Sequence, residues 1–146
     1  MSEPVPHWTA SSLAKALEVS GQITSEEMEI SNPDKTDDVF EVRMKAAGDT
    51  LLFIVVSEEQ ITTTTVLWAR EEMSDPNAFE ALMLRSHRAL MPLSALSIGQ
   101  IGEREYYELF GAMSATSPLS EIIAEFRVIA DNAIELAREL GPKATA

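Results

Sequence analysis

The sequence contains no cysteine. Disulfide bonds, thiolate metal sites and cysteine nucleophiles are therefore excluded together. Histidine is nearly as scarce, because His7 and His87 are the only two in a chain of 146 residues. Neither has a second histidine at helical spacing, so the HExxH zinc motif is absent and we expect neither residue to be catalytic or to bind a metal. A chain without cysteine suits the cytoplasm, where we expect this protein to be.

Long hydrophobic runs are also missing. The longest apolar candidate, Leu51 to Val56, is only the length of a strand, whereas about 20 apolar residues are needed to span a bilayer. The first residues lack the basic segment and the apolar stretch of a secretion signal. We therefore expect no membrane insertion and no export.

Basic residues are few, since 11 Lys and Arg stand against 24 Asp and Glu, which gives a formal net charge of -13. Such a chain repels nucleic-acid phosphates and anionic lipid headgroups, so nucleic-acid binding is not expected. The acidity has two interpretations that the sequence leaves open. It keeps the protein soluble, or it forms a surface for a basic or aggregation-prone partner.

Catalytic and phosphate-binding motifs are absent. The sequence has no GxSxG elbow, no GxxxxGK[ST] loop and no GxGxxG turn. Asp34, Thr36 and Asp38 alternate like the start of a calcium loop, but Val39 occupies the position of the required glycine, which favours a structural turn. Three pairs of glutamates are adjacent in the sequence, Glu26-Glu27, Glu58-Glu59 and Glu71-Glu72. Neighbours on a strand point to opposite faces, so these pairs do not indicate an acid–base couple. We predict no catalytic residue, no cofactor and no metal site.

The first half of the chain predicts one helix followed by strands. Apolar spacing predicts a helix from Trp8 to Val19 that ends at Ser20-Gly21. After it, alternating or β-branched residues predict strands in 22–31, 39–45, 50–56 and 60–68. The turn signal Gly48-Asp49 joins two of these strands, so three of them form an antiparallel meander.

The second half predicts helix, hairpin and helix. Asp75 is the expected cap and Pro76 the first residue of a helix with an apolar stripe formed by Phe79, Leu82, Met83, Ser86 and Leu90. A hairpin is expected to turn at Gly102-Glu103. Ser117 is the expected cap of a final helix of about 22 residues that starts at Pro118 and ends at Gly141-Pro142.

Together these elements predict an α+β fold with an antiparallel sheet, in the order α-β-β-β(β)-α-β-β-α, and with the long C-terminal helix packed on the sheet. The apolar stripe of that last helix is too wide for a coiled-coil seam, which favours packing across a sheet. We expect one domain over residues 1–146, with disordered ends near 1–6 and 142–146.

Apolar strand surface is the one feature in excess. Residues 50–56 have no polar side, so both faces of this strand need a cover, and one layer of helices covers only one. We interpret the excess as an interface with another subunit or a protein partner. The residues that we predict for protein interaction are Leu52, Ile54, Val56, Val66 and Trp68.

Two resemblances rest on these residues. The segment MPLSALSIGQIGEREYYELFGAMSATSPLSEIIAEFRVIADNAIELA, together with DVFEVRM and the apolar strand after it, resembles the YjfI-like family of uncharacterised bacterial cytoplasmic proteins. The resemblance covers nearly the whole chain. Members tend to be encoded beside membrane-remodelling proteins similar to phage-shock protein A, which implies a coiled-coil protein of that kind as a partner and assigns no catalytic residue.

The element order, the small acidic chain and the long final helix resemble the type III secretion chaperone fold. Proteins of that fold are dimers that hold an extended client segment, so this resemblance implies a homodimeric binding protein. The leading hypothesis is thus a non-enzymatic, cytoplasmic, chaperone-like protein that serves a membrane-stress system. A small-ligand sensor is the alternative, followed by an enzyme that uses carboxylates only.

Overall fold

Three helices, one 3-10 turn and six strands make up the part of the chain that the computed structural model describes, residues 7–32 and 38–142. In chain order they are α1 (Ala10–Val19), β1 (Met28–Ser31), β2 (Val39–Met44), β3 (Thr50–Val56), β4 (Gln60–Ala69), η1 (Arg70–Glu72), α2 (Pro76–Leu90), β5 (Ala95–Ile101), β6 (Arg104–Ser114) and α3 (Leu119–Leu140). This order confirms the predicted α+β class. Asp34, Thr36 and the predicted disordered ends, Pro142 apart, lie outside the described residues.

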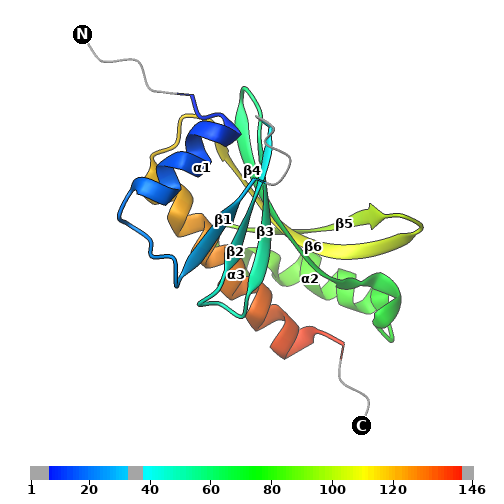
Figure 1. Ribbon diagram of the computed structural model, residues 1–146. Helices are drawn as coiled ribbons and strands as arrows, with labels where there is room; N and C mark the ends of the chain where they lie inside the picture. Colours follow the sequence, from blue (N-terminus) through cyan, green and yellow to red (C-terminus); the bar gives the residue numbers. More distant parts are fainter. Residues whose placement is uncertain (1–6, 33–37, 143–146) are drawn as a thin grey trace.

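All six strands form one antiparallel sheet in the order β1-β2-β3-β4-β6-β5 (Figure 1). The predicted meander is β2-β3-β4, in which Val42 pairs with Leu52 and Thr64 pairs with Phe53. β4 then pairs with β6, a strand that follows more than 30 residues later, and this central pairing joins the meander to the β5–β6 hairpin. The register shifts between Val66 and Ala69, so β4 bends where it leaves β3.

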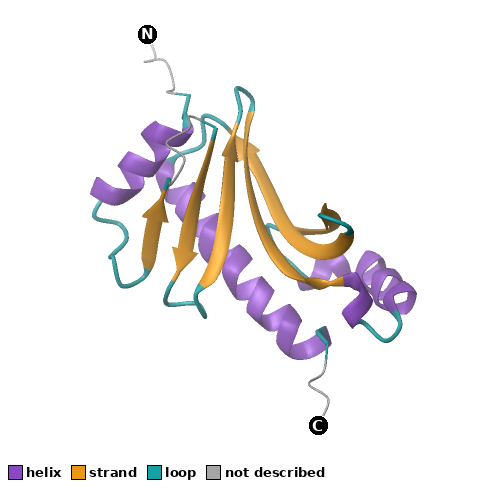
Figure 2. Ribbon diagram, turned by 45° about the vertical axis from the view of Figure 1, so that its right-hand side comes forward, coloured by secondary structure: helices purple, strands orange, loops and turns teal. Residues whose placement is uncertain are grey.

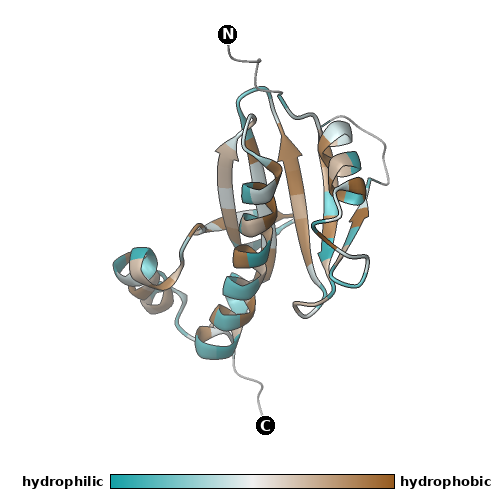
Figure 3. Cartoon of the chain, turned by 90° about the vertical axis from the view of Figure 1, so that its left-hand side faces the viewer, coloured by the Kyte–Doolittle hydropathy of each residue, from teal (hydrophilic) through white to brown (hydrophobic). Residues whose placement is uncertain are grey.

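The helices cover one face of this sheet. α3 crosses the sheet diagonally, and its polar side faces away from the strands (Figure 3). α1 packs over β1, β2 and β3 on that same side. The core lies between these helices and the strands, and its largest fully buried side chains are Tyr107, Phe40, Phe126, Leu13, Leu17, Met44, Leu52, Ile54, Ile61, Met83, Leu109 and Ile122. The view in Figure 2 shows α3 running behind the strands.

α1 begins two residues later than the sequence predicts. Thr9 caps the helix, because its hydroxyl accepts a hydrogen bond from the Ser12 backbone N–H at 3.0 Å, and the Ser12 hydroxyl accepts from the Thr9 N–H in return. Trp8 lies outside the helix, and its indole N–H donates to the carbonyl of Ser117 at 2.8 Å. The start of α1 is therefore fixed to the segment that precedes α3.

α2 starts as predicted, with Pro76 first and Asp75 accepting from the Ala78 N–H at 3.1 Å. Its predicted apolar stripe is only partly correct. Phe79 and Met83 are buried, whereas Leu82 is 42% and Leu90 55% exposed. One narrow side of the helix therefore contacts the sheet, because α2 packs beside the β5–β6 hairpin and not across the sheet as α3 does.

α3 also starts one residue later than predicted. Pro118 takes the cap position and no side chain caps the helix, so Ser117 is not the cap. The helix ends at Leu140 with Gly141 after it, as predicted. Both turn predictions are confirmed, since Gly48 and Asp49 have φ of 65° and 56° and Gly102 has φ of 63°, the left-handed values that tight turns require.

Candidate partner-binding surface

No described helix covers the second face of the sheet, which we call the open face. On β3 the residues alternate, so Leu52, Ile54 and Val56 point to the helices while Leu51, Phe53 and Val55 point to the open face. Val55 pairs with Val39 across β2, and the two side chains are 43% and 40% exposed. An apolar row is thus presented to solvent in the middle of the sheet.

The open face continues across β4 and β6. Phe53 pairs with Thr64, and Thr64 pairs with Phe110, so two phenylalanines flank a threonine on the same face. Val66 lies further along β4 on this face, opposite Glu108. Where β4 extends past the start of β3, a hollow of about 550 Å³ adjoins this row, and its lining combines Leu51, Phe53, Val66 and Tyr106 with Ala133, Ile134 and Ala137 of α3. The hollow therefore lies where the sheet meets α3 and is not part of the open face.

The five residues predicted for protein interaction lie in three environments. Leu52, Ile54 and Val56 are 0%, 0% and 5% exposed beneath the helices, so their side chains form the core of this fold. Val66 is half-buried on the open face. Trp68 is 8% exposed and packs among other aromatic side chains. On β3, the side chains that face the open side are those of Leu51, Phe53 and Val55.

Trp68 belongs to an aromatic cluster that anchors α2. Its ring centroid lies 5.8 Å from that of Phe79 and 6.1 Å from that of Tyr107, and the last two rings are 4.9 Å apart in an edge-to-face arrangement. Such pairs stabilise beyond the area that they bury. The cluster therefore holds the first half of α2 against the end of β4.

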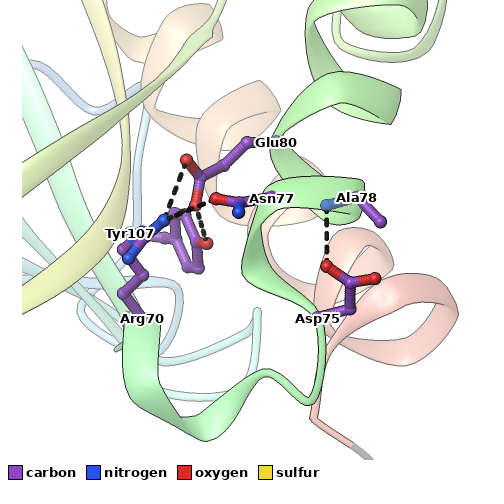
Figure 4. Close-up of polar contacts among 6 residues, drawn as sticks. All are labelled: Arg70, Asp75, Asn77, Ala78, Glu80 and Tyr107. Atoms are coloured by element: carbon purple, nitrogen blue, oxygen red, sulfur yellow. Dashed lines mark hydrogen bonds and ion pairs between the residues drawn. The ribbon is translucent and has the colours of Figure 1, made fainter.

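A polar network lies next to the aromatic cluster (Figure 4). Glu80 on α2 accepts hydrogen bonds from Arg70 Nε at 2.7 Å and from the Tyr107 hydroxyl at 2.6 Å, and Arg70 also donates to Asn77 at 3.1 Å. The bond from Arg70, followed by that from Tyr107, holds the pKa of Glu80 below its usual value. Burial, together with the Glu80 carboxylate, raises the pKa of Tyr107 far above its usual value. The network is thus a structural lock in which the phenol keeps its proton.

A second apolar surface lies on α2 and β5, and we call it the α2–β5 patch. Leu84 is 82% exposed and Ile98 is 44% exposed. Both line a groove of about 250 Å³, whose other lining residues are Glu80, Met83, His87, Leu96, Ser97 and Tyr107. The Leu96 N–H donates to Nε2 of His87 at 2.9 Å, which fixes the end of α2 to β5. β5 is an edge strand, so this patch adjoins backbone groups that another strand can pair with.

The sequence does not show which side chains of residues 50–56 face the open side of the sheet, because this strand has no polar side. The alternation of Phe40, Val42 and Met44 with polar residues indicates which side of β2 faces the core. Once β2 and β3 pair, Val42 faces the same way as Leu52, which assigns Leu52 to the core and Phe53 to the other face. The sequence does not state the pairing register, and a shift of one residue inverts the assignment.

Comparison with known proteins agrees with both resemblances. The chain is 29% identical over 130 residues to "Uncharacterized protein YjfI" of Escherichia coli (strain K12), a match that covers 89% of this chain and 92% of that protein.

Within residues 7–32 and 38–142, no helix combines the length and the apolar character that crossing a membrane requires.

Solved structures show the same fold. YbjN, described as a putative transcription regulator from E. coli, superposes with a TM-score of 0.65 at 12% identity, covering 94% of this chain and 95% of that one. The Yersinia pestis type III secretion chaperone SycH, solved with a stable fragment of YscM2, gives 0.55 at 14% identity over 88% and 99% of the two chains. The ExsC–ExsE complex gives 0.55 at 14% identity over 93% and 98%.

These likenesses confirm the chaperone-like fold that the element order predicts. The family itself is shown by a model that matches residues 7–142, which is nearly the whole sequence. The chain therefore belongs to the bacterial family described as "Uncharacterized protein conserved in bacteria (DUF2170)".

Proposed function

We propose that this chain is a non-enzymatic, chaperone-like protein that binds a polypeptide partner on the open face. The observation that carries the proposal is the apolar row of Leu51, Phe53 and Val55, which continues to Val66 and Phe110 without a covering helix. Removing such a surface from water stabilises a complex by about 25 cal/mol per Å² of apolar area. An extended segment with alternate apolar side chains matches a face of this kind.

The structural neighbours support a protein partner. SycH was solved with a fragment of YscM2, and ExsC was solved with ExsE, so two chains of this fold hold another polypeptide. Fold alone does not transfer a partner, and the proposal for this chain rests on its own open face.

The partner that we propose is a coiled-coil membrane-remodelling protein of the phage-shock-protein-A kind, bound in the cytoplasm. Two observations support it. The resemblance to the YjfI-like family implies such a neighbour, and the net charge of -13 favours a partner with a basic segment. The absence of cysteine is in keeping with a reducing compartment.

We further propose that the protein is a homodimer and that the α2–β5 patch is the contact between subunits. Leu84 and Ile98 are both exposed and line the same groove, so they form one contiguous apolar patch. Exposed apolar patches of this kind often mark protein interfaces. A two-fold axis places the α2–β5 patch of one subunit against the same patch of the other. The exposed apolar side chains of the two copies then cover each other. The open face stays free in such a dimer.

Site-specific photo-crosslinking in the bacterial cell tests the open face. A benzophenone amino acid is placed at Val55 or Val39, both exposed on that face, and at Glu18 on the outer side of α1 as a control. We expect one polypeptide to crosslink from Val55 and Val39 but not from Glu18. Crosslinks of equal yield from all three positions, or from none, contradict the proposal.

Equilibrium sedimentation tests the dimer independently. Leu84→Glu introduces a charge into the α2–β5 patch, and Gln22→Glu adds the same charge at an exposed loop position away from it. We expect the wild type and Gln22→Glu to sediment as dimers and Leu84→Glu as a monomer with an unchanged circular dichroism spectrum. A wild-type protein that remains monomeric at micromolar concentration overturns the dimer and leaves the open-face proposal to its own test.

A further inference from the structure

A groove of about 630 Å³ lies between α3 and the part of β6 that extends beyond the start of β5, and its lining shares Phe110 and Ala112 with the edge of the open face. One wall is the first half of α3, and the other is β6 with the short segment that precedes β5. The lining residues are Leu93, Ser94, Ala95, Phe110, Gly111, Ala112, Met113, Ser114, Ser117, Glu121, Ala124 and Glu125. A volume of this size accommodates a small organic molecule.

Glu125 is the unusual residue in this lining. Its side chain comes from the buried side of α3 and the residue is only 4% exposed. Its Oε2 atom is buried, and no residue within 7–32 or 38–142 forms a hydrogen bond with it. Burial raises the pKa of this carboxyl to about 7. A buried carboxyl without a donor is costly, and such groups are retained in proteins mainly where a donor or a cation is to be met.

The strand opposite is shaped to receive this carboxyl. Gly111 pairs with Thr63 in the interior of the sheet, a position where glycine weakens a strand because it packs no side chain. A Cβ atom on Gly111 would lie 1.9 Å from Oε1 of Glu125 and 3.0 Å from the carbonyl oxygen of Leu93. The absence of a side chain at Gly111 therefore leaves the space that the Glu125 carboxyl occupies.

The wall that faces α3 is held by α3 itself. Nδ2 of Asn132 donates to the Pro92 carbonyl at 2.9 Å and to the Ser94 hydroxyl at 2.8 Å. This clamp sets the width of the groove between Leu93 and Glu125. The groove is thus bounded on both sides by fixed backbone, and its shape is present before any ligand binds.

The charge of the lining is uniformly negative. Glu121, one turn before Glu125 on α3, is the only other titratable residue in the lining, and β6 and the segment 93–95 contribute none. The hydroxyls of Ser94, Ser114 and Ser117 supply acceptors, while Leu93, Phe110 and Met113 supply apolar surface. The lining therefore combines apolar walls with a carboxyl whose Oε2 atom has no hydrogen-bond partner among the described residues.

We propose that this groove binds a ligand with a primary ammonium or guanidinium group on an apolar stem, with the cation at Glu125 and the stem along Leu93 and Met113. The cation supplies the N–H donors that Oε2 lacks, and the pair forms away from water, where charge-assisted hydrogen bonds are strongest. A calcium or magnesium ion does not fit, because those ions require several oxygen ligands around one point.

Nuclear magnetic resonance titration with n-pentylamine tests the proposal, with n-pentanol as the neutral molecule of equal length. We expect saturable shifts at Gly111, Ala124 and Glu125 with the amine and no saturation with the alcohol. Glu125→Gln keeps the shape of the side chain and removes its charge, and we expect affinity for the amine to fall about 10- to 100-fold. Glu18→Gln changes the net charge equally at an exposed position on α1 and is expected to bind as the wild type does.

The pH dependence of binding distinguishes a cationic ligand from a neutral ligand that accepts a hydrogen bond. A cation binds the ionised carboxylate, so affinity is expected to weaken as the pH falls from about 8 to about 6. A neutral acceptor would bind the protonated acid and show the reverse trend, which overturns the proposal. Absence of saturable shifts at millimolar amine, or equal binding by Glu125→Gln, also overturns it.

The source of the cation is a separate arm of the same experiment. Acetyl-Ala-Lys-Ala-amide carries the same ammonium group on a lysine side chain. Saturation by the free amine and not by the peptide indicates a small-molecule ligand, and saturation by the peptide indicates a lysine of a bound polypeptide. In either case Glu125→Gln is expected to weaken the binding by the same 10- to 100-fold, about 1.4 to 2.7 kcal/mol. Because Val55 is on the other face of the sheet, failure here leaves the crosslinking test of the open face unaffected.

Discussion

Arg127 on α3 holds Glu27, exactly 100 positions earlier in the chain, with two hydrogen bonds of 2.9 Å each. The same guanidinium reaches the carbonyl of Gln22 at 3.4 Å. The pair thus joins the loop between α1 and β1 to the middle of the helix that covers the sheet. Its two side chains are 46% and 27% exposed, so solvent screens the interaction.

A double-mutant cycle with Arg127→Ala and Glu27→Gln is expected to give a coupling free energy of about 0.5 to 1 kcal/mol in urea denaturation. The bond from Arg127 lowers the pKa of Glu27. The coupling is therefore present above the ordinary pKa of a glutamate and is lost as the pH falls through the lowered value. The exposed pair Arg138–Glu135 is the control and is expected to give almost none. Equal coupling in both pairs would contradict this.

Glu125→Gln is expected to stabilise the unliganded protein at alkaline pH. Burial raises the pKa of Glu125 to about 7, so ionising it in the folded state costs free energy. The penalty is absent at about pH 4, grows as the pH rises toward 7 and is constant above it, where it amounts to roughly 3 kcal/mol. Urea denaturation at about pH 5 and pH 8 measures it. A variant that is less stable than the wild type at pH 8 shows that the carboxylate has a stabilising partner.

Gly111→Ala and Gly99→Ala are expected to differ although both place a Cβ atom close to a glutamate. At Gly111 the new atom meets Glu125 and the Leu93 carbonyl, which are buried or part of the backbone, so about 1 to 3 kcal/mol of stability is lost. At Gly99 it meets only the end of Glu108, a partly exposed side chain that can turn away.

Rescue of Gly111→Ala identifies its cause. Adding Glu125→Ala removes the carboxyl atoms that the new methyl group would meet and leaves only the Leu93 carbonyl oxygen at 3.0 Å, so most of the lost stability is expected to return. Thermal unfolding of the two single variants and the double variant measures this. Additive losses in the double variant would show that Gly111 is required by its backbone and not by Glu125.

Phe79→Ala is expected to release α2 from the sheet. Phe79 is 5% exposed and contacts both Trp68 and Tyr107, so its truncation costs about 3 kcal/mol or more. Leu84→Ala, on the exposed side of the same helix, is expected to change monomer stability by less than about 0.5 kcal/mol. Hydrogen exchange of the α2 amides distinguishes local release from global unfolding. Equal effects of the two variants would contradict the packing of α2 by its Phe79 side.

Local signals predicted most of the secondary structure. Gly48-Asp49, Asp75-Pro76 and Gly102 each require a particular backbone geometry, and the structure has turns or helix starts at all three. The start of α3 was wrong by one residue because Ser117 and Pro118 both suit a cap, and the indole of Trp8 occupies the Ser117 carbonyl, a contact across 109 positions. Local patterns carry no information about such distant contacts.

The candidate sites were harder to predict than the fold. Leu52, Ile54 and Val56 were chosen over Leu51, Phe53 and Val55 because a fully apolar strand has no polar side to mark its outer face. Trp68 has the composition of an interface residue, yet tertiary packing with Phe79 and Tyr107 buries it. The sequence does not indicate the burial of Glu125, because a glutamate in an amphipathic helix is ordinarily solvated. Gly111 inside a strand was the available signal for a close approach.

The pairing of β4 with β6 also governs the order in which the protein can fold as it is synthesised. The meander is complete at Ala69, but α3, which covers its inner side, begins only at Leu119. Residues such as Leu52 and Ile54 therefore leave the ribosome well before their cover exists. Closing the sheet over so long a separation is slow compared with forming the meander. A nascent chain of this protein is consequently expected to expose the apolar inner side of the meander until α3 has been synthesised.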